Sequence, residues 1–392
     1  MAQASRERAA LGLVVFAALF SQAVLYAGLP DLVVALGAED EIDAGTWFLG
    51  VELTAYVLFA AAWGALSDST GRRTAYVTAA GYAAAALYVG MASAAFVSLG
   101  FDVVLVLRFL QGACAVGVLS LAMTMLMDLA GGHGRNMGAA GLAIGSAVAA
   151  GVPLGGALSE YDALTPLLAA AVSITVAASV ARSVEDRAPG SALGAGGVFR
   201  GVAGRPILTL PYAFGFVDRY TAGFFALVGT YYLREVHGLD AAETGFTLAF
   251  FFVPFALLQY HFGRLSDRVG RVAPIVVGSI AYGVGVVAVG VAPSVDGVRV
   301  ALLFVGALGA LVAPATMALV TDLSRPTERG VAMGGFNVAG SLGFLAGVVV
   351  GGAVVSRAGY LTSFAVAGGL EIGIALAASP VFVFLAARDG VE

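Results

Sequence analysis

The sequence predicts an all-α integral membrane protein in which twelve transmembrane helices form two bundles of six. Of its 392 residues, 60% are hydrophobic and 11% are charged, whereas a soluble domain carries about 25% charged residues. A chain this apolar cannot cover itself with polar side chains in water, so we expect lipid to be its solvent. In addition, a short polar turn that begins at Gly64 recurs at Gly263, half a chain later.

A helix needs ~20 apolar residues to cross the ~30 Å hydrocarbon core of a bilayer. Backbone groups inside lipid must form hydrogen bonds within their own segment, so the apolar segments are expected to be helices. Pro30, Pro153, Pro254 and Pro314 lie inside such segments and are expected to bend helices rather than end them. The segments that qualify are residues 11–36, 46–66, 74–96, 101–127, 136–158, 163–182, 207–233, 244–265, 273–293, 298–321, 330–355 and 360–386.

Arginine placement predicts the orientation, because cytoplasmic loops carry an excess of basic residues. The 20 cationic residues are all arginines. With the N-terminus inside, about fifteen of them fall on the cytoplasmic side and about three on the outer side. We therefore expect a multi-pass protein of the cell membrane with both termini in the cytoplasm. The acidic outer loop at residues 39–43 is either a solvated loop or a cation-capturing one.

The chain is expected to divide into an N-terminal bundle at residues 1–182, a flexible cytoplasmic linker at 183–206 and a C-terminal bundle at 207–392. Further repeats support a duplication: Asp128 matches Asp322 at an offset of 194. Copies of six helices keep the same orientation, so we expect an axis along the membrane normal and a substrate path between the copies.

The polar turn carries the most specific signal. Two glycines, an aspartate and an arginine keep their spacing in both copies: Gly64, Asp68, Gly71 and Arg72 in the first, and Gly263, Asp267, Gly270 and Arg271 in the second. The first copy adds a further arginine, Arg73. This pattern resembles the signature loop of the major facilitator superfamily. The resemblance covers essentially the whole chain, although Ser69 stands where a basic residue is common. It implies a twelve-helix transporter.

Each residue type in the turn has a physical use. Gly64 and Gly263 would let another helix approach closely, and the glycines that follow would permit positive φ. Asp68 and Asp267 are expected just before the next helix, where a carboxylate favours the helix N-terminus and can pair with an arginine. The turn is interpreted either as a cytoplasmic latch between the bundles or as a tight turn that only sets topology.

The fourth segment carries Arg108 and Gln111 in a pattern that resembles an Arg-x-x-Gln-Gly motif of the superfamily, whose arginine is implicated in proton coupling. Arg108 is expected ~10 Å deep, where a guanidinium needs a partner. We expect Glu52 to be that partner, with Asp31 as second choice. The alternative is that Arg108 extends to the outer surface.

The seventh segment places charged and polar residues near mid-membrane, and the first segment offers others at a similar depth. By the resemblance, the seventh helix lines the substrate path. The candidate cavity residues are therefore Gln22, Tyr26, Asp218, Arg219 and Tyr220. The alternative for Asp218 and Arg219 is a structural ion pair between helices.

Two other residues are left without an assigned role. Glu371, in the last segment, is expected either to be protonated or to turn toward a partner such as Arg219. His261 could titrate near neutral pH or serve as a structural hydrogen-bonding group.

Small residues in the fifth and eleventh segments predict close helix packing. They are Gly151, Pro153, Gly155, Gly156, Gly351 and Gly352. The first four resemble, imperfectly, a glycine–proline motif of the drug/proton antiporter branch of the superfamily. Close packing alone explains them equally well.

No lysine is present, so the chain has no Walker-type phosphate loop, and its single cysteine forms no disulfide framework. We expect no enzyme activity, cofactor, metal site or nucleic-acid partner, and a monomer. The predicted function is secondary transport by alternating access, as proton-coupled efflux of amphipathic or hydrophobic compounds. The alternatives are ion-coupled uptake of a sugar, organic anion or zwitterion, and a membrane sensor without transport.

Overall fold

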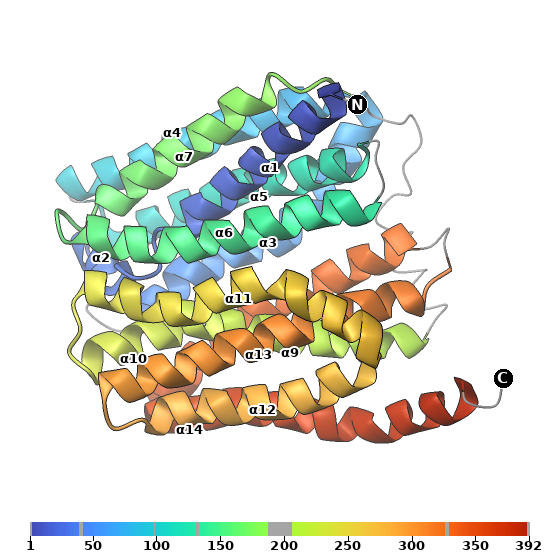
Figure 1. The fold of residues 1–392 in the computed structure, drawn as a ribbon. Helices are drawn as coiled ribbons and strands as arrows, with labels where there is room; N and C mark the ends of the chain where they lie inside the picture. Colours follow the sequence, from blue (N-terminus) through green and yellow to red (C-terminus); the bar gives the residue numbers. More distant parts are fainter. Residues whose placement is uncertain are drawn as a thin grey trace. The chain divides into compact units, whose positions relative to one another are not determined.

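The computed structural model describes residues 2–38, 42–97, 99–129, 133–186, 206–325 and 329–389. Every regular element in these residues is helical, which confirms the all-α prediction (Figure 1). The predicted linker at 183–206 falls mostly outside the described residues.

Of the twelve crossings in the described residues, four are not formed by one separate, continuous helix. The first consists of α1 (Ala2–Ala23) and α2 (Leu29–Ala35). Pro30 lies at the start of α2, so the expectation that this proline bends a continuous helix is wrong. A proline is tolerated there because the first turn of a helix needs no N–H from it. The other three prolines do lie inside helices.

The seventh crossing contains a five-residue π-helical turn, and the last two crossings meet at a glycine. The turn, Phe225–Gly229, separates α9 (Thr209–Phe224) from α10 (Thr230–Glu235). The segment α14 (Arg329–Asp389) holds two helices, because Gly359 has φ 80° and ψ 171° and breaks the helical path.

The remaining helices each form one crossing. They are α3 (Ile42–Thr70), α4 (Arg73–Phe96), α5 (Phe101–Met127), α6 (His133–Ser159), α7 (Thr165–Ala181), α11 (Ala241–Val269), α12 (Val272–Val291) and α13 (Val295–Asp322), with a short 3₁₀ turn at Pro206–Leu208 before α9. With α14 counted as two, the described residues give twelve crossings.

The chain forms two compact units. Unit 1 consists of residues 1–195 and 230–249, and unit 2 of residues 196–229 and 250–392. In unit 1, α1 packs on α6 and α7, and α5 packs on α3 and α4. In unit 2, α14 packs on α9 and α12, and α12 packs on α13. The helix α11 is divided between the two units: its residues up to 249 belong to unit 1, and those from 250 onward belong to unit 2.

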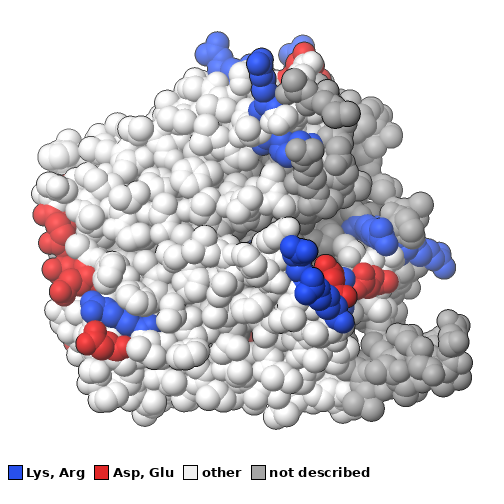
Figure 2. Space-filling model, viewed as in Figure 1, with Lys and Arg blue, Asp and Glu red and all other residues white. Residues whose placement is uncertain are grey.

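The surface is that of a membrane protein. Figure 2 shows charged side chains near the ends of the helices and uncharged atoms between them. Large apolar side chains such as Leu58, Leu142 and Leu257 are exposed on the helices. Taken as single helices, with α14 counted once, eight in the described residues are long and apolar enough to cross a bilayer, and α7 is apolar but shorter. Because water would not tolerate this surface, it is suited to contact lipid acyl chains.

Candidate functional site

A fully buried ion pair lies in the interior of unit 1. The Arg108 guanidinium on α5 donates to Glu52 on α3 at 2.5 Å, and both side chains are 0% exposed. Arg108 also donates to Gln111 at 2.8 Å, and Gln22 on α1 donates to Glu52 at 3.4 Å. These contacts join three helices through one carboxylate and one guanidinium.

Aromatic rings and close backbones complete the surroundings of this pair. The guanidinium carbon of Arg108 lies 4.5 Å from the centre of the Phe48 ring and 5.7 Å from that of Tyr88. Such cation–π contacts stabilise a desolvated cation. A Cβ at Gly112 would lie 2.8 Å from the Glu52 carbonyl oxygen. A larger residue there would push α3 and α5 apart and disturb the pair.

The structure thus brings together Arg108, Gln111, Glu52 and Gln22, which the sequence analysis had assigned to two separate groups. Tyr26 is buried in the break between α1 and α2 and is 4% exposed. The expected pairing of Arg108 with Glu52 is confirmed, and the alternative that Arg108 extends to the outer surface is wrong, since its side chain has no exposed area.

Asp31 has a different partner. Its carboxylate pairs with Arg234, near the end of α10, at 2.5 Å. A few residues after Arg234, the backbone N–H groups of Ala241 and Ala242 at the start of α11 donate to the Glu160 carboxylate. A carboxylate at a helix N-terminus is electrostatically favourable. These two contacts hold residues 230–249 within unit 1.

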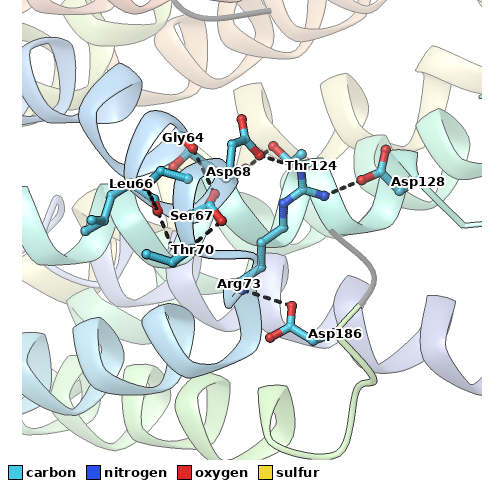
Figure 3. A network of polar contacts seen from close by, with 11 residues as sticks. Gly64, Leu66, Ser67, Asp68, Thr70, Arg73, Thr124, Asp128 and Asp186 are labelled. Carbon is cyan, nitrogen blue, oxygen red and sulfur yellow. Dashed lines mark hydrogen bonds and ion pairs between the residues drawn. The ribbon is translucent and has the colours of Figure 1, made fainter. Parts of the chain in front are cut away.

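A second ionic cluster lies at the predicted cytoplasmic end of unit 1 (Figure 3). Arg73, at the start of α4, is 4% exposed. Its guanidinium pairs with Asp68 at 2.8 Å and with Asp128, which follows α5. The Asp186 carboxylate accepts from the backbone N–H groups of Arg73 and Thr74. One arginine therefore links the ends of α3, α4 and α5, while Asp186 caps α4.

Unit 2 repeats this arrangement in a more exposed form. Arg271 donates to Asp267 at 2.6 Å, to Asp322 at 3.0 Å and to the Ser266 hydroxyl at 2.8 Å. The Asp267 and Asp322 side chains are 62% and 51% exposed. Partial burial alone would lower the pKa of Arg271, but the hydrogen bonds to Asp322 and Asp267 outweigh it and leave the pKa raised. Arg271 therefore keeps its positive charge in this cluster.

Two details of the predicted turn are corrected. Asp68 and Asp267 lie in the last turns of α3 and α11, not before the next helix. A carboxylate at a helix C-terminus is unfavourable, which explains why each needs its arginine. In unit 1, Asp186 performs the capping expected of Asp68.

The expected close helix approach at Gly64 is also absent, since no described atom lies within 4 Å of a Cβ built there. At Gly263 the nearest contact, to Pro314, is 3.6 Å and therefore ordinary. By contrast, Gly71 and Gly270 have φ values of 67° and 84°, the left-handed conformation that the turn requires. Arg72 lies exposed between the helices.

The interior of unit 2 contains two buried carboxyl groups instead of an ion pair. Asp218 on α9 is 7% exposed and Glu371 on α14 is 1% exposed. Glu371 accepts a hydrogen bond from Thr221 at 3.0 Å. Of the two alternatives predicted for Glu371, the contact with Arg219 is not found among the described residues. Arg219 instead packs beside Gly340, where a Cβ would lie 3.1 Å from its Cγ.

Tyr220, predicted to line the cavity, is buried and is 2% exposed. Its hydroxyl has no hydrogen-bond partner among the described residues. The charged residues Asp218 and Arg219 are adjacent in sequence, but neither forms an ion pair in the described part of the chain. The predicted alternative of a structural ion pair between helices is therefore not found there.

The predicted packing glycines lie at helix contacts. A Cβ at Gly151 would lie 2.9 Å from Ala23, and one at Gly155 would overlap the Val24 carbonyl. Gly156 touches the backbone of Ala241 at the start of α11. Pro153 lies within α6, between these contacts. The α6 glycines therefore pack against both the first crossing and α11.

In unit 2, Gly351 packs on the seventh crossing. A Cβ there would lie 3.1 Å from both Phe224 and Val228. Gly352, its neighbour in the predicted pair, is buried.

Sequence reasoning missed three carboxylates of the cytoplasmic clusters: Asp128, Asp186 and Asp322. The signal for two of them was present, because Asp128 and Asp322 repeat at an offset of 194. A charged residue that recurs at equivalent places in both copies could have been assigned to the turn arginines. Asp186 has no such counterpart.

Comparison with known proteins gives a family match along nearly the whole chain. A family model described as Major Facilitator Superfamily matches residues 11–239 and 212–390. The crystal structure of the human organic anion transporter MFSD10 (TETRAN) has a TM-score of 0.71 at 20% identity, over 95% of this chain and 99% of that one. At this identity the likeness shows the fold alone.

Two curated relatives are similar in sequence. A probable actinorhodin transporter of Streptomyces coelicolor is 32% identical over 143 residues, which are 36% of this chain and 24% of that protein. The chain thus matches less than half the length of this relative. A class G tetracycline resistance protein of Vibrio anguillarum is 28% identical over 316 residues, or 74% of this chain and 77% of that protein.

Proposed function

Because the chain belongs to the major facilitator superfamily, and is thus a multi-pass membrane transporter, we propose that it exports amphipathic or hydrophobic compounds in exchange for protons. Transport would proceed by alternating access, with the substrate between two six-helix bundles. Both termini would lie in the cytoplasm of a cell-membrane protein, as the arginine distribution predicts. The names of the two relatives, one a resistance protein, support export.

The observation that carries the proposal is the pair of Arg108 and Glu52. A charge in the membrane interior is costly and is usually functional. Neither member is needed to fill space, since a hydrophobic pair of similar size is often as stable as a buried ion pair. Glu52 can accept a proton, and doing so would release Arg108 and Gln22 from their shared partner. Protonation would thereby change the contacts among α1, α3 and α5.

The test uses the purified protein in proteoliposomes and separates binding from coupling. Wild-type protein should exchange tetracycline or ethidium by counterflow and should accumulate it when a pH gradient is imposed. The double variant E52Q/R108Q removes both charges without leaving either one unpaired. It should retain counterflow and lose accumulation driven by the gradient. Unchanged driven accumulation in the double variant would refute the coupling role.

A second candidate is transport of an organic anion. Arg219 lies in α9, a part of the predicted substrate path, and forms no ion pair in the described part of the chain, so it could attract a carboxylate. Counterflow of fluorescein without exchange of tetracycline or ethidium would favour this candidate. If none of the three compounds is exchanged by counterflow, a membrane sensor that does not transport would be favoured.

A further inference from the structure

The buried carboxylates of the two units differ in whether they have an ion-pair partner. In unit 1, Glu52 has a guanidinium 2.5 Å away. In unit 2, neither Asp218 nor Glu371 forms an ion pair with any described residue, although both are more than nine-tenths buried. An isolated carboxylate away from water is strongly unfavourable, and it is neutralised by a proton when no cation is available.

The groups around Glu371 can be named from each element packed against it. On α9 they are Thr221, which donates to Glu371, and Asp218, which interacts with it electrostatically. On α12 it is Tyr282, which is 1% exposed and interacts with Thr221 and with both carboxyl groups. None of these groups is a cation.

On the side of α12, the backbone packs directly beside Glu371. A Cβ at Gly283 on α12 would overlap the Gly368 carbonyl and would lie 3.0 Å from the Glu371 Cβ. The helices α12 and α14 therefore touch at the level of Glu371.

One hydrogen-bonding position faces no partner. The Asp218 Oδ1 is buried and has no hydrogen bond among the described residues. Arg219, the next residue, acts electrostatically on Asp218, whereas the groups that act on Glu371 are Asp218 and Thr221. With both acids ionised, one buried negative charge would therefore have no cation, and a single proton would neutralise it. A proton on either carboxyl group would also supply a donor, which a cluster of ionised acids lacks.

We propose that Asp218 and Glu371 form a proton-binding site in unit 2, in which the two carboxyl groups hold one proton between them at neutral pH. The site lies in the opposite repeat from Arg108 and Glu52 and joins α9 to α14. The site would be a second proton-binding group for the proposed proton-coupled export. Its physiological role rests on that proposed function. Protonation and release would change the charge between these two helices, and so the preferred packing of α9.

The experiment is infrared spectroscopy of the full-length protein in lipid, titrated with pH, to detect the carbonyl stretch of a protonated carboxyl group. Wild-type protein should show this band at neutral pH, and E371Q should lose it. D218N should change the pH at which the band disappears, because the neighbouring charge is gone. D296N, whose carboxylate is 89% exposed at the start of α13, is the control and should leave both the band and its titration unchanged.

The variant E371D distinguishes loss of the carboxyl group from a folding defect in E371Q. It keeps the acid, so the band should reappear at an altered frequency. No protonated band in the wild type, or a band unaffected by both E371Q and D218N, would overturn the proposal. So would a band that disappears when Na⁺ is added at constant pH, since the pair would then bind a metal cation. The readout needs no substrate: an intact band with no gradient-driven transport would refute the proposed coupling and leave the proton site standing.

Discussion

Replacing Glu52 with glutamine should destabilise the protein strongly, because it leaves the Arg108 guanidinium buried and uncompensated. Glutamine has nearly the same shape, so packing is conserved and the change isolates the charge. At a separation of 2.5 Å, Coulomb's law with an effective dielectric constant of about 20 gives an attraction of roughly 7 kcal/mol. The desolvation of both ions opposes this, and removing one partner of a buried pair costs about 3–5 kcal/mol in practice.

The measurement is the free energy of unfolding in mixed detergent micelles, followed by helical circular dichroism. E52Q and R108Q should each lose about 3–5 kcal/mol. The double variant should be more stable than the sum of the single effects predicts, by about 2–3 kcal/mol, because neither charge is then left alone. The control is D267N, whose carboxylate is 62% exposed and should cost no more than ~1 kcal/mol.

Two results would contradict this prediction: an E52Q stability within about 1 kcal/mol of wild type, or single effects that simply add. Either result would mean that water or a rearrangement of neighbouring groups compensates Arg108. The pair would then not be the closed, dry interaction on which the coupling proposal depends.

Three further predictions concern the turns and the glycines. R73A should destabilise unit 1 by about 1–3 kcal/mol more than R271A destabilises unit 2, because the first arginine is nearly buried and the second is partly exposed; equal losses in the same unfolding assay would contradict this. G155A should be costly, since its Cβ meets the backbone of the first crossing, whereas G64A should be neutral or slightly stabilising; comparison of the two thermal midpoints checks it. D68N should shift the resting protein toward the inward-open state, as the latch interpretation requires, and unchanged labelling of cysteines introduced on each face would count against it.

The fold could be predicted in considerable detail from the sequence, because its evidence is one-dimensional. Apolar length defines a crossing, and a repeat at a fixed offset defines a duplication. The paired turns at Gly71 and Gly270 followed from residue type alone, and both glycines adopt the positive φ that was expected. Pro30 was misjudged because a proline at a helix start and one at a bend look alike in a hydropathy pattern.

The partners of Asp31 and Glu371 depended on the tertiary packing. The sequence predicted Glu52 as the partner of Arg108, and the structure confirms this pair. The rotation of the helices about their axes gave Asp31, the second choice, a different partner, Arg234. In the same way, Glu371 found Thr221 rather than Arg219. The physical reason is that lipid selects only the apolarity and length of a segment, whereas the neighbour that a buried charge meets depends on lateral packing, which a run of apolar residues does not encode.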